Sequence, residues 1–268
     1  MARIINSVQN PLIKQVLLLT EKARERKKQG LIVAEGLREV GLALKKGFRA
    51  QCLFYDETCI APEALDEILA AAAVTPGELI SVSAPVMEKI AYRAGVPNVV
   101  ALLERRDLRL SDLQLSENPL LLVLETVEKP GNLGAMLRTA DAAGVDAVIV
   151  CDPLVDEYNP NVIRASLGAI FSVPLVTTDS APALEWLHLH GVRILSTWLE
   201  ASRPYFDCDL RGPVAFVMGS EAHGISDVWV RESSERIIIP MQGEVDSLNV
   251  SASAAIVLFE ALRQRGAQ

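Results

Sequence analysis

The chain has 268 residues, half of them hydrophobic, and a formal net charge of −8. This length and hydrophobic content suffice for one large domain or two ordinary ones with a sizeable core. No apolar run approaches the ~20 residues that span a bilayer, and residues 1–7 lack the apolar centre of a signal peptide, so we expect a cytoplasmic protein. The cysteines show no C-x-x-C and no neighbouring histidine pattern, which predicts reduced, buried thiols and no metal site; they are Cys52, Cys59, Cys151 and Cys208.

The first third of the chain alternates helical and strand patterns. Apolar spacing predicts helices at residues 10–26, 37–46 and 62–73 and strands at 31–34, 52–55, 79–82 and 99–103. A polar, turn-rich stretch at 104–119 marks a boundary. We therefore expect a small α/β domain at residues 1–106, a linker at 107–118 and a second domain at 119–268.

Positive charge is concentrated near the start of the chain. Residues 1–49 contain 11 Lys and Arg against 4 Asp and Glu, whereas residues 112–268 contain 10 against 21. A basic patch attached to an acidic body fits an RNA footprint on one domain, although a solvated helix face would carry the same charges. The candidate RNA-binding residues are Lys14, Arg24, Lys27, Lys28 and Arg38.

Beyond the boundary, short continuous apolar runs alternate with helical patterns. The predicted strands are 120–124, 147–150, 175–177, 193–197, 214–218 and 236–239. The predicted helices are 133–143, 162–169, 181–190, 226–231 and 250–264. This alternation predicts a parallel sheet covered by helices on both faces.

Three polar segments stand out in this second part. Pro130 to Arg138 and Gly219 to Gly224 each follow an apolar run and contain glycines. Residues 245–255 precede an apolar helix that needs only one N-cap, yet they offer Ser247, Asn249, Ser251 and Ser253. Polar turns at the carboxyl ends of strands are typical of a ligand crevice in an open α/β sheet.

Together these segments resemble the three motifs of the SpoU/TrmH branch of the SPOUT methyltransferases. They read N-x-G-A-x-x-R from Asn132 to Arg138, G-x-E-x-x-G from Gly219 to Gly224 and S-L-N-V-S from Ser247 to Ser251. The resemblance covers roughly residues 120–265. It implies methyl transfer from S-adenosylmethionine to a ribose 2′-hydroxyl of RNA, a deep trefoil knot formed by the C-terminal segment, and a homodimer through the knotted domain.

The first domain is similar to the ribosomal-protein-like RNA-binding domain that many family members carry. The matching patterns are Ser7-x-x-Asn10-Pro11-x-Ile13-Lys14 and Val33-Ala34-Glu35-Gly36, and they are less specific than the catalytic motifs. A basic domain of this kind favours a large structured substrate, ribosomal RNA over tRNA, read through shape and 2′-hydroxyls.

The resemblance also implies roles for individual side chains. Arg138 stands at the family's catalytic arginine; because a guanidinium stays charged in proteins, we expect it to clamp a phosphate and stabilise the 2′-oxyanion. Asn132 and Glu221 would orient these groups, although Glu221 could be only an acid at a helix start. Asn249 and Ser247 would lie near the ribose and the cofactor, or serve only as N-caps.

Cofactor binding in this family is largely through the backbone, so residue identity predicts it weakly. The expected pocket residues follow several strands: Thr197, Trp198, Leu199, Met218, Gly219, Ile239, Met241, Leu248 and Ser253.

Other functions fit the sequence less well. A dinucleotide-binding oxidoreductase fails because Gly131-x-x-Gly134 lacks the G-x-G-x-x-G spacing. A non-catalytic RNA-binding or ribosome-assembly factor with the same fold stays open, and S-adenosylmethionine binding would discriminate between the two.

Overall fold

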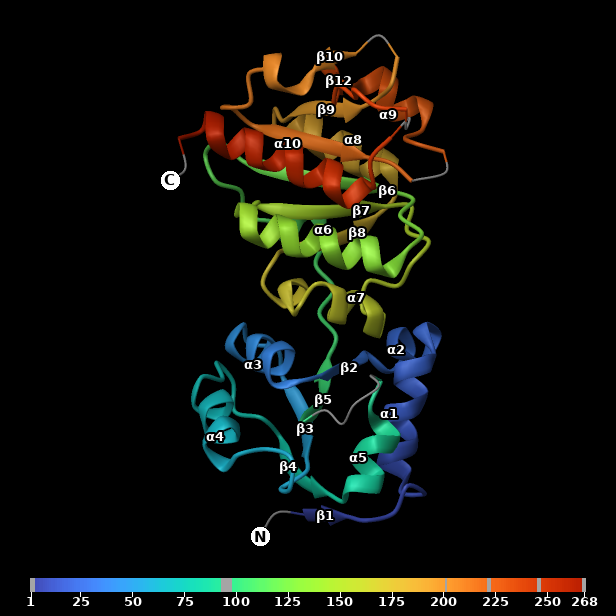
Figure 1. Ribbon diagram of the computed structural model, residues 1–268, viewed down its shortest axis with the longest axis vertical. Helices are drawn as coiled ribbons and strands as arrows, with labels where there is room; N and C mark the ends of the chain where they lie inside the picture. Colours follow the sequence, from blue (N-terminus) through green and yellow to red (C-terminus); the bar gives the residue numbers. More distant parts are fainter. Residues whose placement is uncertain (1–2, 93–97, 201, 221–222, 245–246, 267–268) are drawn as a thin grey trace. The chain divides into compact units, whose positions relative to one another are not determined.

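The computed structural model describes residues 3–92, 98–200, 202–220, 223–244 and 247–266 (Figure 1). It divides into two compact units: Met1–Arg106 with Tyr158–Ser172, and Asp107–Glu157 with Val173–Gln268. The short segment Tyr158–Ser172 thus interrupts the second unit and joins the first. The Phe171 ring meets the Phe48 ring edge-on at 5.0 Å, and such tertiary contacts leave no trace in sequence periodicity.

The first unit is built on a mixed five-stranded sheet. The strand order is β1-β4-β3-β5-β2, and β5 runs antiparallel to both of its neighbours. The strands are β1 (Arg3–Ile5), β2 (Leu31–Glu35), β3 (Ala50–Tyr55), β4 (Glu78–Val82) and β5 (Val99–Glu104). The helices are α1 (Pro11–Glu21), α2 (Ala23–Gln29), α3 (Leu37–Lys45), α4 (Pro62–Ala70), α5 (Ala84–Ile90) and α7 (Pro160–Ala165).

Helices cover this sheet on both faces. Buried side chains of α1 and α5 form one core with alternate residues of the strands, while α3 lies against the other face and contacts α4. The α1 face buries Ile13, Val16 and Leu19 at helical spacing, so the predicted amphipathic pattern decides how this helix lies.

Two predicted helices of this unit have different bounds in the structure. The single helix expected at residues 10–26 is wrong, because Lys22 is extended (φ −117°, ψ 107°) and separates α1 from α2. The helix expected at 162–169 ends at Ala165, because Leu167 and Gly168 have φ values of 52° and 85°, which a helix does not accommodate.

The second unit contains a seven-stranded sheet in the order β10-β12-β9-β11-β6-β7-β8. Every pairing between its named strands is parallel, as the sequence predicts. The strands are β6 (Leu120–Glu125), β7 (Ala147–Cys151), β8 (Leu175–Thr178), β9 (Arg193–Thr197), β10 (Arg203–Pro204), β11 (Val214–Met218) and β12 (Glu235–Ile238).

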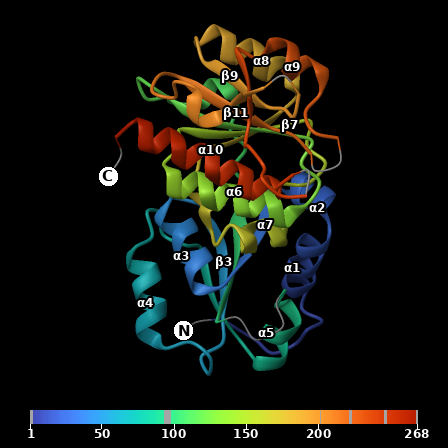
Figure 2. The ribbon, with the colours of Figure 1, turned by 45° about the horizontal axis from the view of Figure 1, so that its top comes forward.

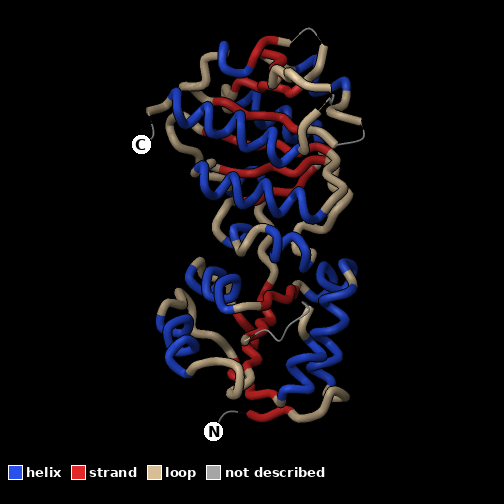
Figure 3. Tube along the Cα trace, in the orientation of Figure 1, coloured by secondary structure: helices blue, strands red, loops and turns tan. Residues whose placement is uncertain are grey.

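Helices cover both faces of this sheet as well (Figures 2 and 3). Alternate strand residues such as Leu121, Val123 and Val217 form a core with α8 and α9. On the opposite face α6 and α10 lie side by side, as both ribbon views show, and α10 contacts β11. The helices are α6 (Pro130–Ala143), α8 (Ser180–Leu189), α9 (Asp227–Glu232) and α10 (Val250–Gln264).

The C-terminal end of α10 is fastened to loops at the amino-terminal side of the sheet. The Arg265 guanidinium donates hydrogen bonds to the carbonyl oxygens of Asn118 (2.6 Å), Leu210 (2.9 Å) and Gly212 (2.6 Å). Burial lowers the pKa of Arg265 from its usual value. A half-buried guanidinium with several carbonyl acceptors is well satisfied, so α10 has a fixed end.

Apolar helices and cysteines were considered as signs of a membrane protein or a metal-binding protein. Among the described residues no helix is long and apolar enough to span a membrane. Cys52, Cys151 and Cys208 are buried as expected, but Cys59 is exposed, so the prediction of four buried thiols is wrong for one of them.

Candidate active site

The parallel sheet brings the carboxyl ends of four neighbouring strands to one edge. These strands, in spatial order, are β12, β9, β11 and β6. Because all of them are parallel, the segments that follow them emerge together, which is where open α/β sheets bind ligands. Two of the three polar motifs follow β6 and β11, and the third starts α10.

The first and third motifs meet through a side-chain hydrogen bond. The Asn249 amide nitrogen donates to the Asn132 side-chain oxygen at 3.3 Å, although 117 residues separate the two. The Asn249 side-chain oxygen accepts from the Ser251 backbone N–H at 3.0 Å and so caps α10. Asn249 therefore caps α10, which is one of the two roles considered for it, and also joins the first motif to the third.

The second motif forms a tight turn after β11. Ser220 and Gly224 exchange backbone hydrogen bonds of 2.9 and 3.0 Å, and the His223 N–H donates to the Ser220 hydroxyl at 3.0 Å. A Cβ on Gly219 would lie 2.0 Å from the carbonyl carbon of Gly224, so only glycine fits there. Glu221 lies outside the described residues.

A small pocket opens where these turns come together. One wall is the segment between β6 and α6, the other is the start of the second motif, and α10 begins at its rim. The lining residues are Val127, Glu128, Lys129, Asn132, Gly219, Ser220 and Val250. A carboxylate, an ammonium, an amide and a hydroxyl beside two valines can hold a small ligand that carries both charges and an apolar part.

Of the expected cofactor residues, Gly219 lines this pocket. Thr197 and Met218 end β9 and β11 at the same edge, and the Thr197 hydroxyl donates to the Val217 carbonyl oxygen at 3.1 Å. Trp198 donates its backbone N–H to the Ile237 carbonyl oxygen at 3.0 Å. Its ring lies beside Gly224, 4.0 Å from where a Cβ there would be.

The other expected cofactor residues do not line this pocket. Ile239 and Met241 are half-buried after β12, whereas Leu199 and Leu248 are exposed. Ser253 lies in the first turn of α10, where its hydroxyl donates to the Asn249 carbonyl oxygen at 3.4 Å.

Sequence reasoning missed most of the pocket wall. Val127, Glu128 and Lys129 were not expected to line it, and neither was Ser220. Their position between a predicted strand and a predicted helix start is the signal that could have identified the first three.

Arg138 and Ser247 do not line the pocket. Arg138 is exposed on α6, six residues after Asn132, which places its Cα about 9 Å farther along the helix axis and a third of a turn around it. Ser247 is exposed two residues before the N-cap of α10. Arg138 and Ser247 thus lie outside the lining of this pocket.

Comparison with known proteins identifies the family. A model of the SpoU rRNA methylase family matches residues 119–259, and a model of the MRM3-like substrate binding domain matches residues 10–101. An uncharacterized tRNA/rRNA methyltransferase of Synechocystis sp. is 34% identical over 98% of this chain and 94% of its own length. The chain belongs to the SpoU rRNA methylase family. The predicted family, and the predicted parallel α/β fold with a preceding substrate-binding domain, are confirmed.

Two further relatives extend the comparison. The 23S rRNA (guanosine-2'-O-)-methyltransferase RlmB of Yersinia pestis is 44% identical over 155 residues, which are 58% of this chain and 63% of that protein. The match therefore spans less than two thirds of RlmB. The crystal structure of an AdoMet-bound rRNA methyltransferase from Sinorhizobium meliloti superimposes with a TM-score of 0.89 at 30% identity, covering 98% of each chain.

The basic residues of the substrate-binding domain are distributed over three helices. The five predicted RNA-binding residues are all exposed: Lys14, Arg24, Lys27, Lys28 and Arg38. Arg26, in the middle of the same basic run, is only 2% exposed. Its guanidinium donates to the carbonyl oxygens of Leu19 (2.6 Å) and Thr20 (3.1 Å) at the end of α1. One of the basic residues in this run therefore fixes α2 to α1.

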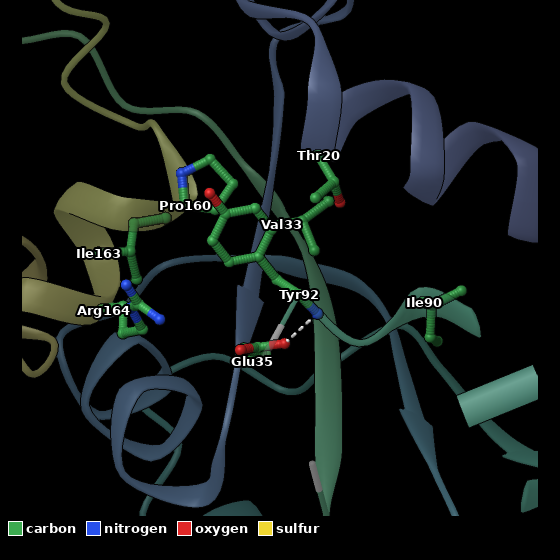
Figure 4. A pocket seen from close by; sticks show the side chains of 8 residues that line it. All are labelled: Thr20, Val33, Glu35, Ile90, Tyr92, Pro160, Ile163 and Arg164. Atoms are coloured by element: carbon green, nitrogen blue, oxygen red, sulfur yellow. Dashed lines mark hydrogen bonds between the residues drawn. The ribbon is translucent and has the colours of Figure 1, made fainter. Parts of the chain in front are cut away.

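A second pocket lies within this first unit of the SpoU-family protein (Figure 4). Its lining residues are Thr20, Val33, Glu35, Ile90, Tyr92, Pro160, Ile163 and Arg164. Glu35, from the Val33–Gly36 pattern, accepts a hydrogen bond from the Tyr92 backbone N–H at 2.7 Å. The carboxylate at this pocket thus holds the backbone, and none of the three catalytic motifs reaches it.

Proposed function

We propose that the protein transfers a methyl group from S-adenosylmethionine to a ribose 2′-hydroxyl of ribosomal RNA, in the cytoplasm. The observation that carries the proposal is the Asn249–Asn132 hydrogen bond, which joins two family motifs at the pocket. The names of the relatives support ribosomal RNA: RlmB of Yersinia pestis acts on guanosine of 23S rRNA. A tRNA substrate is the alternative, because the Synechocystis relative is named for both.

The chemistry of the described pocket's lining suits one end of S-adenosylmethionine. That molecule carries an α-amino acid group and a sulfonium beside an apolar adenosyl part, and the lining offers Glu128, Lys129 and Asn132 beside valines. The Gly219 backbone, kept bare by its contact with Gly224, adds peptide groups to the wall. When bound, the cofactor supplies an electrophilic methyl group. Gly219, Ser220 and Asn132 are the residues we assign to holding it, with Thr197, Trp198 and Met218 at the same edge.

The residues of the chain would supply orientation and charge. A ribose hydroxyl is a poor nucleophile, so holding it in line provides several kcal/mol of the barrier. Stabilising the developing oxyanion provides about 3 kcal/mol more. We assign the second role to Arg138, whose fork of N–H donors suits a phosphate and an oxyanion together. The proton would leave to the phosphate or to water, and Glu221 and Asn249 would orient the reacting groups.

The substrate-binding domain would contact the RNA backbone. Arg24, Lys27 and Lys28 are exposed on α2, which the buried Arg26 holds against α1. Phosphate contacts of this kind give affinity and position without reading sequence. Lys14 and Arg38 would extend the basic surface along α1 and α3.

A homodimer through the second unit is also part of the proposal. The outer face of α10 shows Ala252, Ala255 and Ile256 partly or fully exposed, and Phe259 is 50% exposed. These residues recur at i, i+3, i+4 and i+7, which is one apolar stripe of a helix. A second copy would cover it. Sedimentation of a Phe259→Asp variant should show half the mass of the wild type, and an unchanged mass would contradict this interface.

The trefoil knot stays a proposal, supported by the strand order. The chain leaves β12, on the far side of β9 and β11, and then forms α10 against α6 and β11. It therefore crosses the carboxyl ends of two intervening strands. Stretching the second unit from its two ends by force should release less length than its contour length, because a tightened knot retains residues; release of the full length would refute the knot.

The first experiment is calorimetry of S-adenosylmethionine binding to the purified protein. Micromolar affinity is expected, and an absence of binding both with and without ribosomal RNA would favour a non-catalytic RNA-binding factor. Mapping of ribose methylation in cells with and without the protein then identifies the target. A mark lost from tRNA instead of ribosomal RNA would overturn the choice of substrate.

A further inference from the structure

A buried carboxylate lies at the end of β6, two residues before the first residue that lines the candidate active site. Glu125, the last residue of β6, is 3% exposed. It accepts two hydrogen bonds from Ser226: one from the backbone N–H at 2.7 Å and one from the hydroxyl at 2.5 Å. A buried acid is stabilised only when its oxygens are well satisfied, and both oxygens here bind a residue that lies 101 positions away in the chain.

The position of this pair relates it to the pocket. The segment that follows Glu125 forms one wall, with Val127, Glu128 and Lys129. Gly219 and Ser220 form the other wall, and Ser226 lies two residues after Gly224, with which Ser220 pairs. The last paired residues of β6 and β11 are Leu124 and Met218. The sheet pairing between these two strands therefore ends before the segments that form the walls begin. Beyond the last pair, the Glu125–Ser226 hydrogen bonds connect the two segments.

The backbone next to Glu125 is under strain. Thr126 has φ 50°, and a β-branched residue in the left-handed region is an outlier that persists only where its surroundings dictate it. Its N–H donates to the Cys151 carbonyl oxygen at 3.0 Å, which turns the chain from the end of β6 into the pocket wall. The geometry of the wall thus depends on several fixed contacts around Glu125.

A second set of hydrogen bonds also holds α9. The Trp229 indole N–H donates to the Ser180 hydroxyl at 3.0 Å, and that hydroxyl donates to Asp152. Trp229 is buried, and Ser226 is the N-cap of the same short helix. Because α9 is fixed in this way, the Glu125–Ser226 pair connects the first wall to an anchored element rather than to a free loop.

We infer that Glu125 is a positioning residue of the methyltransferase site: through Ser226 it sets Gly219, Ser220, His223 and Gly224 against the wall Val127–Lys129, and so fixes the width of the cofactor pocket. The inference rests on the proposed function for its cofactor, but the geometric claim concerns only the two walls. Glu125 touches neither the pocket interior nor the reacting atoms.

The test compares Glu125→Gln with a matched control at Asp146, a residue just before β7 whose carboxylate binds the first residue of β6. Asp146 also accepts two backbone hydrogen bonds, from Ser116 at 2.7 Å and from Leu120 at 2.9 Å, but it lies away from the pocket. Asp146→Asn therefore removes a comparable carboxylate without touching the walls. Ser226→Ala is a milder variant that keeps the backbone donor and retains the fold if Glu125→Gln does not.

Two measurements are made below the unfolding temperature of every variant. Hydrogen exchange of the amides of Ser220, His223, Gly224 and Ser226 should be at least tenfold faster in Glu125→Gln and severalfold faster in Ser226→Ala, but unchanged in Asp146→Asn. The Kd for S-adenosylmethionine should rise about tenfold in Glu125→Gln and less than twofold in Asp146→Asn. Glu125→Asp retains a carboxylate, so its amide exchange rates and its Kd for S-adenosylmethionine should lie between those of the wild type and those of Glu125→Gln.

The outcomes separate the inference from the proposed function. Equal exchange and equal Kd in Glu125→Gln and Asp146→Asn, with only the melting temperatures lowered, would mean a structural role and overturn the inference. If the wild type binds no S-adenosylmethionine, the proposed function fails, while the exchange of the four amides still decides whether Glu125 positions the turn.

Discussion

The second unit collects its motif residues at one edge of a parallel sheet, whereas the first unit spreads its basic residues over helices around a mixed sheet. In the parallel sheet, turns that are distant in sequence end side by side, so Asn132 and Asn249 can bond directly. In the mixed sheet, β5 runs against its neighbours, and no single edge collects the turns. The parallel sheet of the second unit suits a pocket for a small molecule, and the mixed sheet of the first unit suits a broad surface for a polyanion.

The largest effect is expected at Arg138, since the comparison assigns chemistry to the second unit alone. Arg138→Lys should lower the single-turnover rate of methyl transfer to ribosomal RNA by ~100-fold or more, because an ammonium cannot reproduce the donor fork. The control is Arg211→Lys, an exposed arginine of the same unit that pairs with Asp209, and it should be silent. A rate for Arg138→Lys within twofold of the wild type would remove Arg138 from the mechanism.

A smaller effect is expected on the RNA surface of the first unit. Reversing two charges in Lys27→Glu/Lys28→Glu should weaken RNA binding by about tenfold and lower the salt slope by about 2, because two phosphate contacts are lost. S-adenosylmethionine affinity should stay unchanged. Lys45→Glu/Lys46→Glu carries the same change of charge at the end of α3, and an equal loss there would indicate net charge instead of a defined surface.

The two units each contain an N-cap asparagine, so the effects of replacing these two residues can be compared directly. Asn10 caps α1 by accepting from the Leu12 N–H at 2.9 Å, and Asn249 caps α10 in the same way. Replacing either one with alanine should lower the free energy of unfolding by about 1 kcal/mol in urea denaturation. Only Asn249→Ala should also weaken S-adenosylmethionine binding, because it removes the bond to Asn132. Equal affinities in the two variants would show that Asn249 is a cap and nothing more.

Of the residues in these predictions, the four cysteines should have the smallest effect on activity. Their thiols should differ in their accessibility to an alkylating reagent. Burial raises the pKa of Cys52 and of Cys208 to about 11, and it also raises the pKa of Cys151. At pH 8 a thiol with that pKa is ~0.1% thiolate, and the fraction rises tenfold per pH unit. Iodoacetamide at pH 8 should therefore label only the exposed Cys59 of the native protein by mass spectrometry. Labelling of Cys52 at the same rate would contradict the burial of that strand.

Most of the fold follows from local patterns. The strands at Arg193–Thr197 and Val214–Met218 and the helix at Val250–Gln264 agree with the prediction residue for residue, because long apolar runs and helical spacing are strong signals. The strand β1 and the helix α5 were missed, since elements of three and seven residues carry little periodicity. The break at Lys22 has no Pro or Gly to announce it; Arg26, folded back onto the end of α1, stabilises it through a tertiary contact.

The site was predictable in its motifs but not in its walls. The polar turns indicated which segments meet, because parallel strands end together. The distance between Asn132 and Arg138 along α6 follows from the helix alone, yet which of the two faces the pocket depends on how α6 and α10 contact each other. The Glu125–Ser226 pair is invisible in the sequence, since neither residue belongs to a recognisable motif spacing.

The Arg265 hydrogen bonds have a consequence for protein synthesis. The acceptors include the carbonyl oxygens of Asn118 and Pro119, just before β6. Their donor, Arg265, is synthesised almost 150 residues later. Domains that leave the ribosome first generally fold first, and the first unit can do so once its last segment, Tyr158–Ser172, has emerged. The second unit can complete itself only after residue 265 has emerged, so nascent chains stalled before that point should expose a half-built sheet to chaperones.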